Sequence, residues 1–135
     1  MKFYKEMKAV KEGLESLGYD VLVPMEVESG RVPLEALPHV TDEEKITAKI
    51  EYDFIRGHFK KINTSDAILV LNYEKKGVPG YIGGNTFLEM GYAFGLGKKI
   101  YLMNPVPKMD YAVEMHAMKP IVIHGDLQII GNNTA

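Results

Sequence analysis

Three short apolar runs, separated by stretches with helical spacing, constrain the fold of this 135-residue chain most strongly. The runs are Ala67–Leu71, Lys99–Met103 and Ile121–Ile123. Continuous apolar runs of this length are typical of strands that a parallel sheet buries on both faces. Their alternation with helices predicts an α/β fold, an open parallel sheet with flanking helices that is flavodoxin- or Rossmann-like.

Apolar spacing and capping residues locate the helices. Apolar side chains recur three and four residues apart from Tyr4 to Leu17, and Gly18 follows them as a C-cap residue. Thr41 or Asp42 can cap the next helix, which carries an apolar face as far as Asn63. The expected helices cover residues 4–17, 42–63, 85–96 and 110–118.

The remaining segments connect or end these elements. Tyr19–Pro24 is expected to be a short strand that the proline ends, and residues 25–42 a loop over the sheet edge. Asp126–Ile130 is expected to add a last turn. The length suits one domain, which we place at residues 1–130, with a flexible tail at residues 131–135.

The order of the elements departs from the usual pattern at the start. Open parallel α/β folds normally begin with a strand that becomes central to the sheet, whereas this chain begins with a helix. Met1–Phe3 is too short to supply that strand. We therefore expect that the assigned start lies too far downstream, or that another element or subunit fills the first-strand position.

Composition narrows the classes of function. The net charge of −2 gives no electrostatic reason to expect nucleic-acid binding. The chain has no cysteine, which excludes disulfides, thiolate catalysis and cysteine-based zinc sites. No apolar run is long enough to span a membrane and no signal-peptide pattern opens the chain, so we expect a cytoplasmic protein with no membrane contact.

A Gly-rich turn after the first apolar run carries the main candidate site. The turn begins at Gly80, includes Gly83, Gly84, Asn85 and Thr86, and opens directly into a helix that bears Glu89 on its first turns. Glycines allow close approach of a ligand, and a helix N-terminus favours anions. The alternatives are that residues 83–86 form only a tight turn and N-cap, and that Glu89 is a first-turn acid that complements the helix dipole.

Three segments resemble the nucleoside 2-deoxyribosyltransferase superfamily, including its deoxynucleoside-monophosphate N-glycosidase branch. Phe3–Met7 is like the segment after the family's first strand. Ile62–Val70 is like its helix end and following strand, and Gly83–Ala93 is like its Gly-rich turn with the motif Glu-(aliphatic)-Gly-(aromatic or aliphatic)-Ala. Together the segments span most of the chain.

The resemblance implies roles for individual residues. Glu89 corresponds to the nucleophile that attacks the anomeric carbon and expels the base, chemistry that suits a carboxylate. His58 stands where the family has an acidic residue that handles the proton of the leaving base, and imidazole can take that role near neutral pH. The alternative for His58 is a structural role.

Other residues would contact the substrate under the same resemblance. Gly83, Gly84 and Asn85 would line the sugar or phosphate site. Asp66 is a further candidate, whose alternative is to brace the loop between helix and strand. Tyr4 would edge the pocket or belong to the core.

The leading hypothesis is an enzyme that cleaves an N-glycosidic bond or transfers a 2-deoxyribosyl group, with a small-molecule nucleoside or nucleotide as substrate. This chemistry requires no metal and no cofactor. The resemblance implies a homodimer or larger homo-oligomer. The first alternative is a nucleotide-binding sensor without catalysis. The second is a structural domain whose missing strand comes from a partner.

Overall fold

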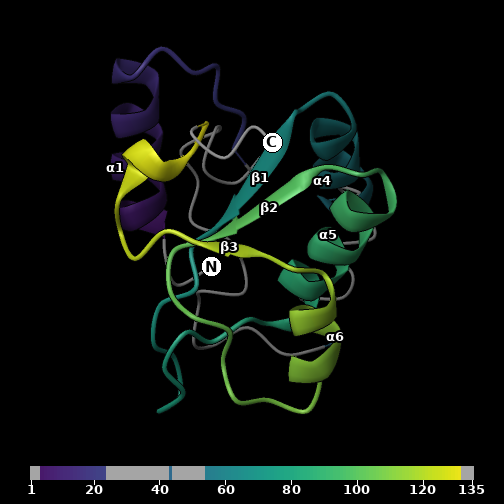
Figure 1. Ribbon diagram of the computed structural model, residues 1–135. Helices are drawn as coiled ribbons and strands as arrows, with labels where there is room; N and C mark the ends of the chain where they lie inside the picture. Colours follow the sequence, from purple (N-terminus) through teal and green to yellow (C-terminus); the bar gives the residue numbers. More distant parts are fainter. Residues whose placement is uncertain (1–3, 24–42, 44–53, 132–135) are drawn as a thin grey trace. The chain divides into compact units, whose positions relative to one another are not determined.

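The computed structural model describes residues 4–23, 43 and 54–131. Contacts within the chain divide it into two compact units, Met1–Lys61 and Ile62–Ala135. The first unit contains α1 (Tyr4–Ser16) and most of α4 (Phe54–Asn63). The second contains a parallel sheet with its helices (Figure 1). An α/β fold with an open parallel sheet is therefore confirmed for the second unit.

Helix α1 ends with a hydrogen-bonded cap, as the sequence predicted. Gly18 has a φ of +95°, which glycine adopts without steric cost. Its N–H donates to Glu15 O at 3.0 Å, and the N–H of Tyr19 donates to Leu14 O at 3.2 Å. This pair of bonds is the Schellman motif, which satisfies carbonyls at the helix C-terminus.

The strand expected at Tyr19–Pro24 is wrong for the residues that the structure describes. Residues 19–23 form no strand, although Val23 is buried and its carbonyl accepts a hydrogen bond from the Lys61 ammonium of α4. Alternating apolar residues make a strand only where a neighbouring strand offers a hydrogen-bonding partner. The expected loop at 25–42, most of the expected helix before Phe54, and residues 132–135 of the expected tail lie outside the described residues.

The sheet of the second unit consists of β1 (Ala67–Val70), β2 (Lys99–Leu102) and β3 (Ile121–Val122), in that order and all parallel. Val70 pairs with Leu102, and Leu102 pairs with Val122. The sheet thus places β2 at its centre. Residues 100–102 of β2 are buried, whereas residues 67–69 of β1 are only half-buried. The prediction that these strands are buried on both faces is therefore confirmed for the central strand, β2, and wrong for most of β1.

Two helices connect these strands. Helix α5 (Gly84–Gly95) links β1 to β2 and packs against both, and α6 (Ala112–Ala117) links β2 to β3. Figure 1 shows α5 and α6 on the same side of the sheet, as two right-handed crossovers in one direction require. A short 3₁₀ turn, η2 (Leu127–Ile129), follows β3 and is capped by the Asp126 carboxylate, which accepts from the Gln128 N–H at 3.0 Å.

The core of the second unit lies between the sheet and these helices. Five apolar side chains there are almost fully buried: Ile82, Met90, Leu102, Met115 and Ile123. Ile82 belongs to the loop that precedes α5, so this loop is part of the core. Because the strands are parallel, the loops after β1 and β2 leave the sheet at the same edge (Figure 1). That edge is where open α/β sheets bind ligands.

Candidate functional site

Two asparagines join the carboxyl ends of β1 and β2. Asn72 follows β1, is fully buried, and accepts the Asn104 N–H on its side-chain oxygen at 2.9 Å. Its Nδ2 donates to Asn104 O at 2.7 Å, and Asn104 Nδ2 donates to Asn72 O at 3.0 Å. Each asparagine therefore satisfies backbone groups of the other, which ties the two loops together at the base of the site.

The same amide holds the start of the Gly-rich turn. Asn72 Nδ2 also lies 3.3 Å from Gly80 O and 3.2 Å from Pro105 O. Gly80 has a φ of +70°, and a Cβ at this position would lie 2.7 Å from Pro105 O. Only glycine fits here, because both the backbone conformation and the close approach of the second loop exclude a side chain.

Between Asn72 and Gly80 the chain forms a small hairpin. Lys75 and Val78 form an antiparallel bridge, with N–H to O distances of 3.2 and 3.0 Å. The two residues at its tip, Lys76 and Gly77, have φ values of 55° and 76°. Positive φ at both central residues defines a type I′ turn, which matches the twist of paired strands. The hairpin is thus an ordered element.

Tyr111, just before α6, braces the other end of the turn. Its hydroxyl donates a hydrogen bond to Ile82 O. Its ring stacks on Phe87 of α5, with centroids 4.5 Å apart and an interplanar angle of 29°. Burial, with smaller contributions from Tyr81 and Asp110, raises the pKa of the Tyr111 phenol above its ordinary value of 10.0. The phenol therefore keeps the proton that this hydrogen bond needs.

Helix α5 begins without a side-chain cap. Its N-cap is Gly83, with φ −77° and ψ 171°, whose carbonyl accepts the Phe87 N–H at 2.9 Å. The N–H groups of the first turn point away from the helix and carry its positive dipole end. Gly84 and Asn85 at this turn are exposed. The arrangement provides several backbone donors beside the Gly-rich turn, as the sequence predicted.

Glu89 lies in the second turn of α5, within the first turns that the sequence predicted. It is the sixth residue of the helix, and the first turn contains no acidic residue. The alternative that Glu89 is a first-turn acid that complements the helix dipole is therefore wrong, because the dipole effect fades beyond the first turn. Glu89 follows Asn85 by four residues, so the two share one face of α5. The carboxylate-bearing side chain is half-buried.

The other predicted site residues lie elsewhere. Asp66 is exposed and precedes β1, so the length of this strand, about 10 Å, separates it from the edge where Asn72 lies. Tyr4 is the first residue of α1, and His58 is a half-buried residue of α4. Both belong to the first unit. Of the predicted residues, the second unit brings together Gly83, Gly84, Asn85 and Glu89.

Three residues that shape the site were not predicted from the sequence. They are Asn72, Asn104 and Tyr111, which together hold both ends of the Gly-rich turn. A signal for the asparagines exists, because each directly follows the last residue of an apolar run. The carboxyl ends of neighbouring parallel strands meet at one edge, so two such amides fall within reach of each other. The sequence around Tyr111 offers no comparable signal.

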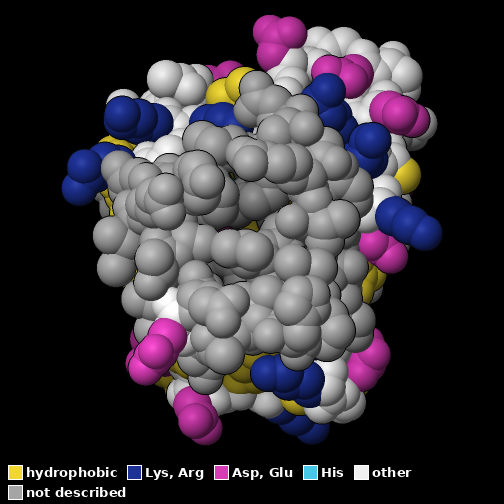
Figure 2. Space-filling view, turned by 180° about the vertical axis from the view of Figure 1, so that it is seen from behind, with side chains coloured by type: hydrophobic (Ala, Val, Ile, Leu, Met, Phe, Trp, Pro, Cys, Tyr) yellow, Lys and Arg dark blue, Asp and Glu magenta, His cyan; other side chains and the backbone are white. Residues whose placement is uncertain are grey.

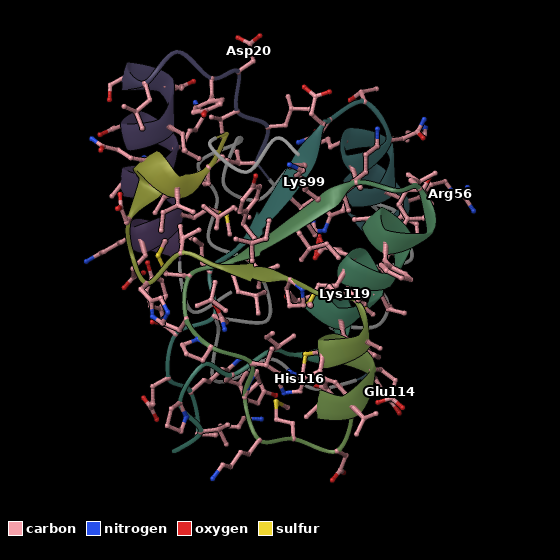
Figure 3. The ribbon with its side chains drawn as sticks, in the orientation of Figure 1. Asp20, Arg56, Lys99, Glu114, His116 and Lys119 are labelled. Carbon is pink, nitrogen blue, oxygen red and sulfur yellow. The ribbon has the colours of Figure 1, made fainter. Side chains whose placement is uncertain are left out.

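The described residues do not form a metal-binding cluster. Among residues 4–23, 43 and 54–131, no three histidine or acidic side chains are grouped as metal ligands. Glu114 and His116 are both exposed and leave α6 on different sides (Figure 3). In the view of Figure 2, the described Lys and Arg side chains lie among Asp and Glu side chains rather than in one continuous patch. The described charges on this face are therefore of mixed sign.

None of the described helices has the length and apolarity that crossing a lipid bilayer requires.

Comparison with known proteins adds no family assignment. No protein-family model, no curated protein and no solved structure matches the chain.

Proposed function

We propose that this chain cleaves the N-glycosidic bond of a nucleoside or nucleotide, or transfers its 2-deoxyribosyl group, with Glu89 as nucleophile. The proposal includes a flavodoxin- or Rossmann-like fold and a relationship to the nucleoside 2-deoxyribosyltransferase superfamily. One observation carries it: after β1 the chain forms the hairpin between Asn72 and Gly80 and then the Gly-rich turn, which opens into α5, and α5 bears Glu89 one turn after Asn85. The resemblance requires this order.

The chemistry that we propose has two displacements. A carboxylate oxygen of Glu89 bonds to the anomeric carbon as the bond from that carbon to the base nitrogen breaks, and the base leaves with the electron pair. The leaving base takes a proton, for which His58 is the candidate donor under the resemblance. Water, or a second base, then attacks the same carbon and releases the Glu89 carboxylate, and the proton that it loses returns to the group that protonated the leaving base. Atoms and charge balance without a redox step.

The order of the surrounding loop supports this assignment. Asn72 bonds Gly80 O at one end of the Gly-rich turn, and Tyr111 bonds Ile82 O near the other. The stack of Tyr111 on Phe87 extends this support to the first turns of α5. A turn held at both ends positions a bound sugar without an ordering cost at the moment of binding, which favours catalysis.

The test is release of free base from 2′-deoxynucleosides and their 5′-monophosphates. We expect base release by the wild-type protein and a loss of at least about 10³-fold in Glu89→Gln, because removal of a covalent nucleophile leaves only binding and orientation. Glu114→Gln, on the exposed side of α6, is the matched control and should keep full activity. Equal base release by Glu89→Gln and the wild type would refute the mechanism.

A nucleotide-binding sensor is the second candidate, favoured by the uncapped N-terminus of α5, whose backbone donors bind anions without any part for Glu89. A sensor predicts stabilisation by a nucleotide in thermal unfolding, with no base released. The resemblance also supports a homodimer or larger homo-oligomer, which sedimentation equilibrium tests directly.

A further inference from the structure

Helix α5 contains three glycines that its own fold does not require. Gly84, Gly91 and Gly95 lie within α5, and none of the three has a positive φ. A Cβ at any of these positions would meet no atom of the described residues within 4 Å. Glycine inside a helix lowers stability relative to alanine, so neither backbone conformation nor packing within the chain accounts for these residues. They leave open space beside the helix, which a second helix can approach closely.

The three glycines share one face of α5 with an exposed leucine. Successive spacings of four, three and four residues place all four residues on one side of the helix. This side faces away from the buried residues Met90 and Ala93. Leu88 is 49% exposed. We call this face the glycine stripe, and it consists of Gly84, Leu88, Gly91 and Gly95.

The helix layer that contains the glycine stripe is apolar beyond the stripe itself. In the described part of the second unit, the exposed large hydrophobic side chains are Leu88, Phe94, Leu96 and Val113. The first three belong to α5 or its C-cap, and Val113 belongs to α6, on the same side of the sheet (Figure 1). Among the 12 residues of α5, Glu89 alone is charged. A helix face in water normally carries polar residues, so this layer has the character of a protein contact.

The glycine stripe is complementary to a second copy of itself. Two α5 helices can pack antiparallel about a two-fold axis midway between Leu88 and Gly91. Leu88 of each copy then lies opposite Gly91 of the partner subunit, and Gly84 lies opposite Gly95 of the partner subunit. Each leucine fills the space that a glycine leaves. The stripe also contains no charge, so no like charges meet across the axis.

We propose that the glycine stripe is a homodimer interface, in which α5 helices of two copies of this chain pack antiparallel. The inference rests on the packing of α5 and does not depend on the cleavage chemistry. Glu89 is one residue after Leu88 and therefore lies about 100° further round the helix, outside the contact. One pair of short helices offers less than the roughly 800 Å² per partner of a standard interface, so we expect a dimer that dissociates at micromolar concentrations.

The first experiment is sedimentation equilibrium of the full chain at concentrations from about 1 to about 200 μM. We expect the wild type to show a reversible monomer–dimer equilibrium. Leu88→Lys should weaken it at least about tenfold, because the two-fold axis places an ammonium in an apolar contact twice. Leu22→Lys is the matched control. Leu22 is 55% exposed and belongs to the first unit, so this variant should associate like the wild type.

The second experiment tests the antiparallel register. Leu88→Gly removes the side chain that fills the space, and Gly91→Leu fills the space that receives it, so each single variant should weaken the dimer at least about tenfold. The double variant carries both changes. The leucine introduced at position 91 then lies opposite the glycine introduced at position 88 of the partner subunit, and the dimer should return. Circular dichroism and urea unfolding of the single and double variants check the fold.

Each outcome bears on the glycine stripe. A wild type that remains monomeric over the whole range overturns the inference. A dimer that Leu88→Lys leaves intact, or that Leu22→Lys weakens equally, places the contact elsewhere and also overturns it. A double variant that associates no better than the single variants refutes the antiparallel pairing. Base release is measured separately, so the interface and the cleavage chemistry can fail independently.

Discussion

Asn72 and Asn104 exchange three hydrogen bonds that connect the carboxyl ends of neighbouring parallel strands. The shortest of these bonds, from Asn72 Nδ2 to Asn104 O, is 2.7 Å long. Asn72 is fully buried, and its remaining contacts reach Gly80 O and Pro105 O. The base of the candidate site is therefore a polar network inside the protein, where each lost bond leaves a buried group without a partner.

Replacement of Asn72 should be costly. We expect Asn72→Ala to lower the free energy of unfolding by about 2–4 kcal/mol, because the partly buried Asn104 N–H and several carbonyls lose their partner. Asn72→Asp should be at least as damaging, since a carboxylate cannot donate to those carbonyls. Urea unfolding measures both. Asn63→Ala, at an exposed helix end, is the control, and a similar small effect for Asn63 and Asn72 would contradict the network.

Gly80→Ala tests the close approach of the two loops. Gly80 and Gly77 both have positive φ, at +70° and +76°, but only at Gly80 would a Cβ lie 2.7 Å from a backbone oxygen, that of Pro105. Gly77→Ala should cost about 1–2 kcal/mol for the left-handed conformation alone. Gly80→Ala should cost clearly more in the same urea experiment. Equal losses would show that the loops separate without cost.

Within the part of the chain that the structure describes, local patterns predicted the helices well, because their signals lie within one segment. The apolar spacing from residue 4 to 17 and the glycine at 18 correspond to α1 and its Schellman cap. The same motif ends α5, where the N–H groups of Gly97 and Lys98 donate to Phe94 O and Ala93 O. Helix hydrogen bonds and caps are local, so a short stretch of sequence contains the information.

Strands and burial were harder to predict because they depend on distant partners. Tyr19–Val23 has a strand-like sequence, yet it forms no strand. The apolar run at β1 suggested burial on both faces, which the structure gives to β2 at the centre of the sheet. Propensity describes how a residue fits a pleated surface, and only the tertiary fold decides whether that surface is covered.

In the candidate site, too, the local features could be predicted from the sequence and the contacts between distant residues could not. The Gly-rich turn and the start of α5 follow from local sequence. The position of Glu89 in the second turn depends on where the helix begins, and sequence patterns locate helix ends poorly. The contacts of Asn72 with Asn104 and of Tyr111 with Ile82 join residues 32 and 29 positions apart. No local pattern encodes such pairs.

The variant Tyr111→Phe distinguishes the contribution of the hydroxyl hydrogen bond from that of the ring stack. The variant keeps the stack on Phe87 and loses the hydrogen bond to Ile82 O, so we expect a loss of about 1 kcal/mol in the free energy of unfolding. Tyr111→Leu also loses the stack and should cost about 0.5–1.5 kcal/mol more. Urea unfolding of the three proteins gives both differences. Identical values for the two variants would show that the stack contributes nothing.

The raised pKa of Tyr111 predicts how its contribution changes with pH. Because the pKa in the folded protein lies above 10.0, the unfolded chain releases this proton at a lower pH than the folded protein does. The contribution of Tyr111 to stability is therefore complete below pH 10.0 and is lost as the pH rises through the folded pKa.

The measurement is urea unfolding of the wild type and of Tyr111→Phe from about pH 8 to about pH 11. Subtracting the variant cancels the titration of the other groups that the two proteins share, and the difference in free energy should shrink above pH 10.0. A difference that stays constant or grows over this range would contradict a phenol held neutral beside the Gly-rich turn.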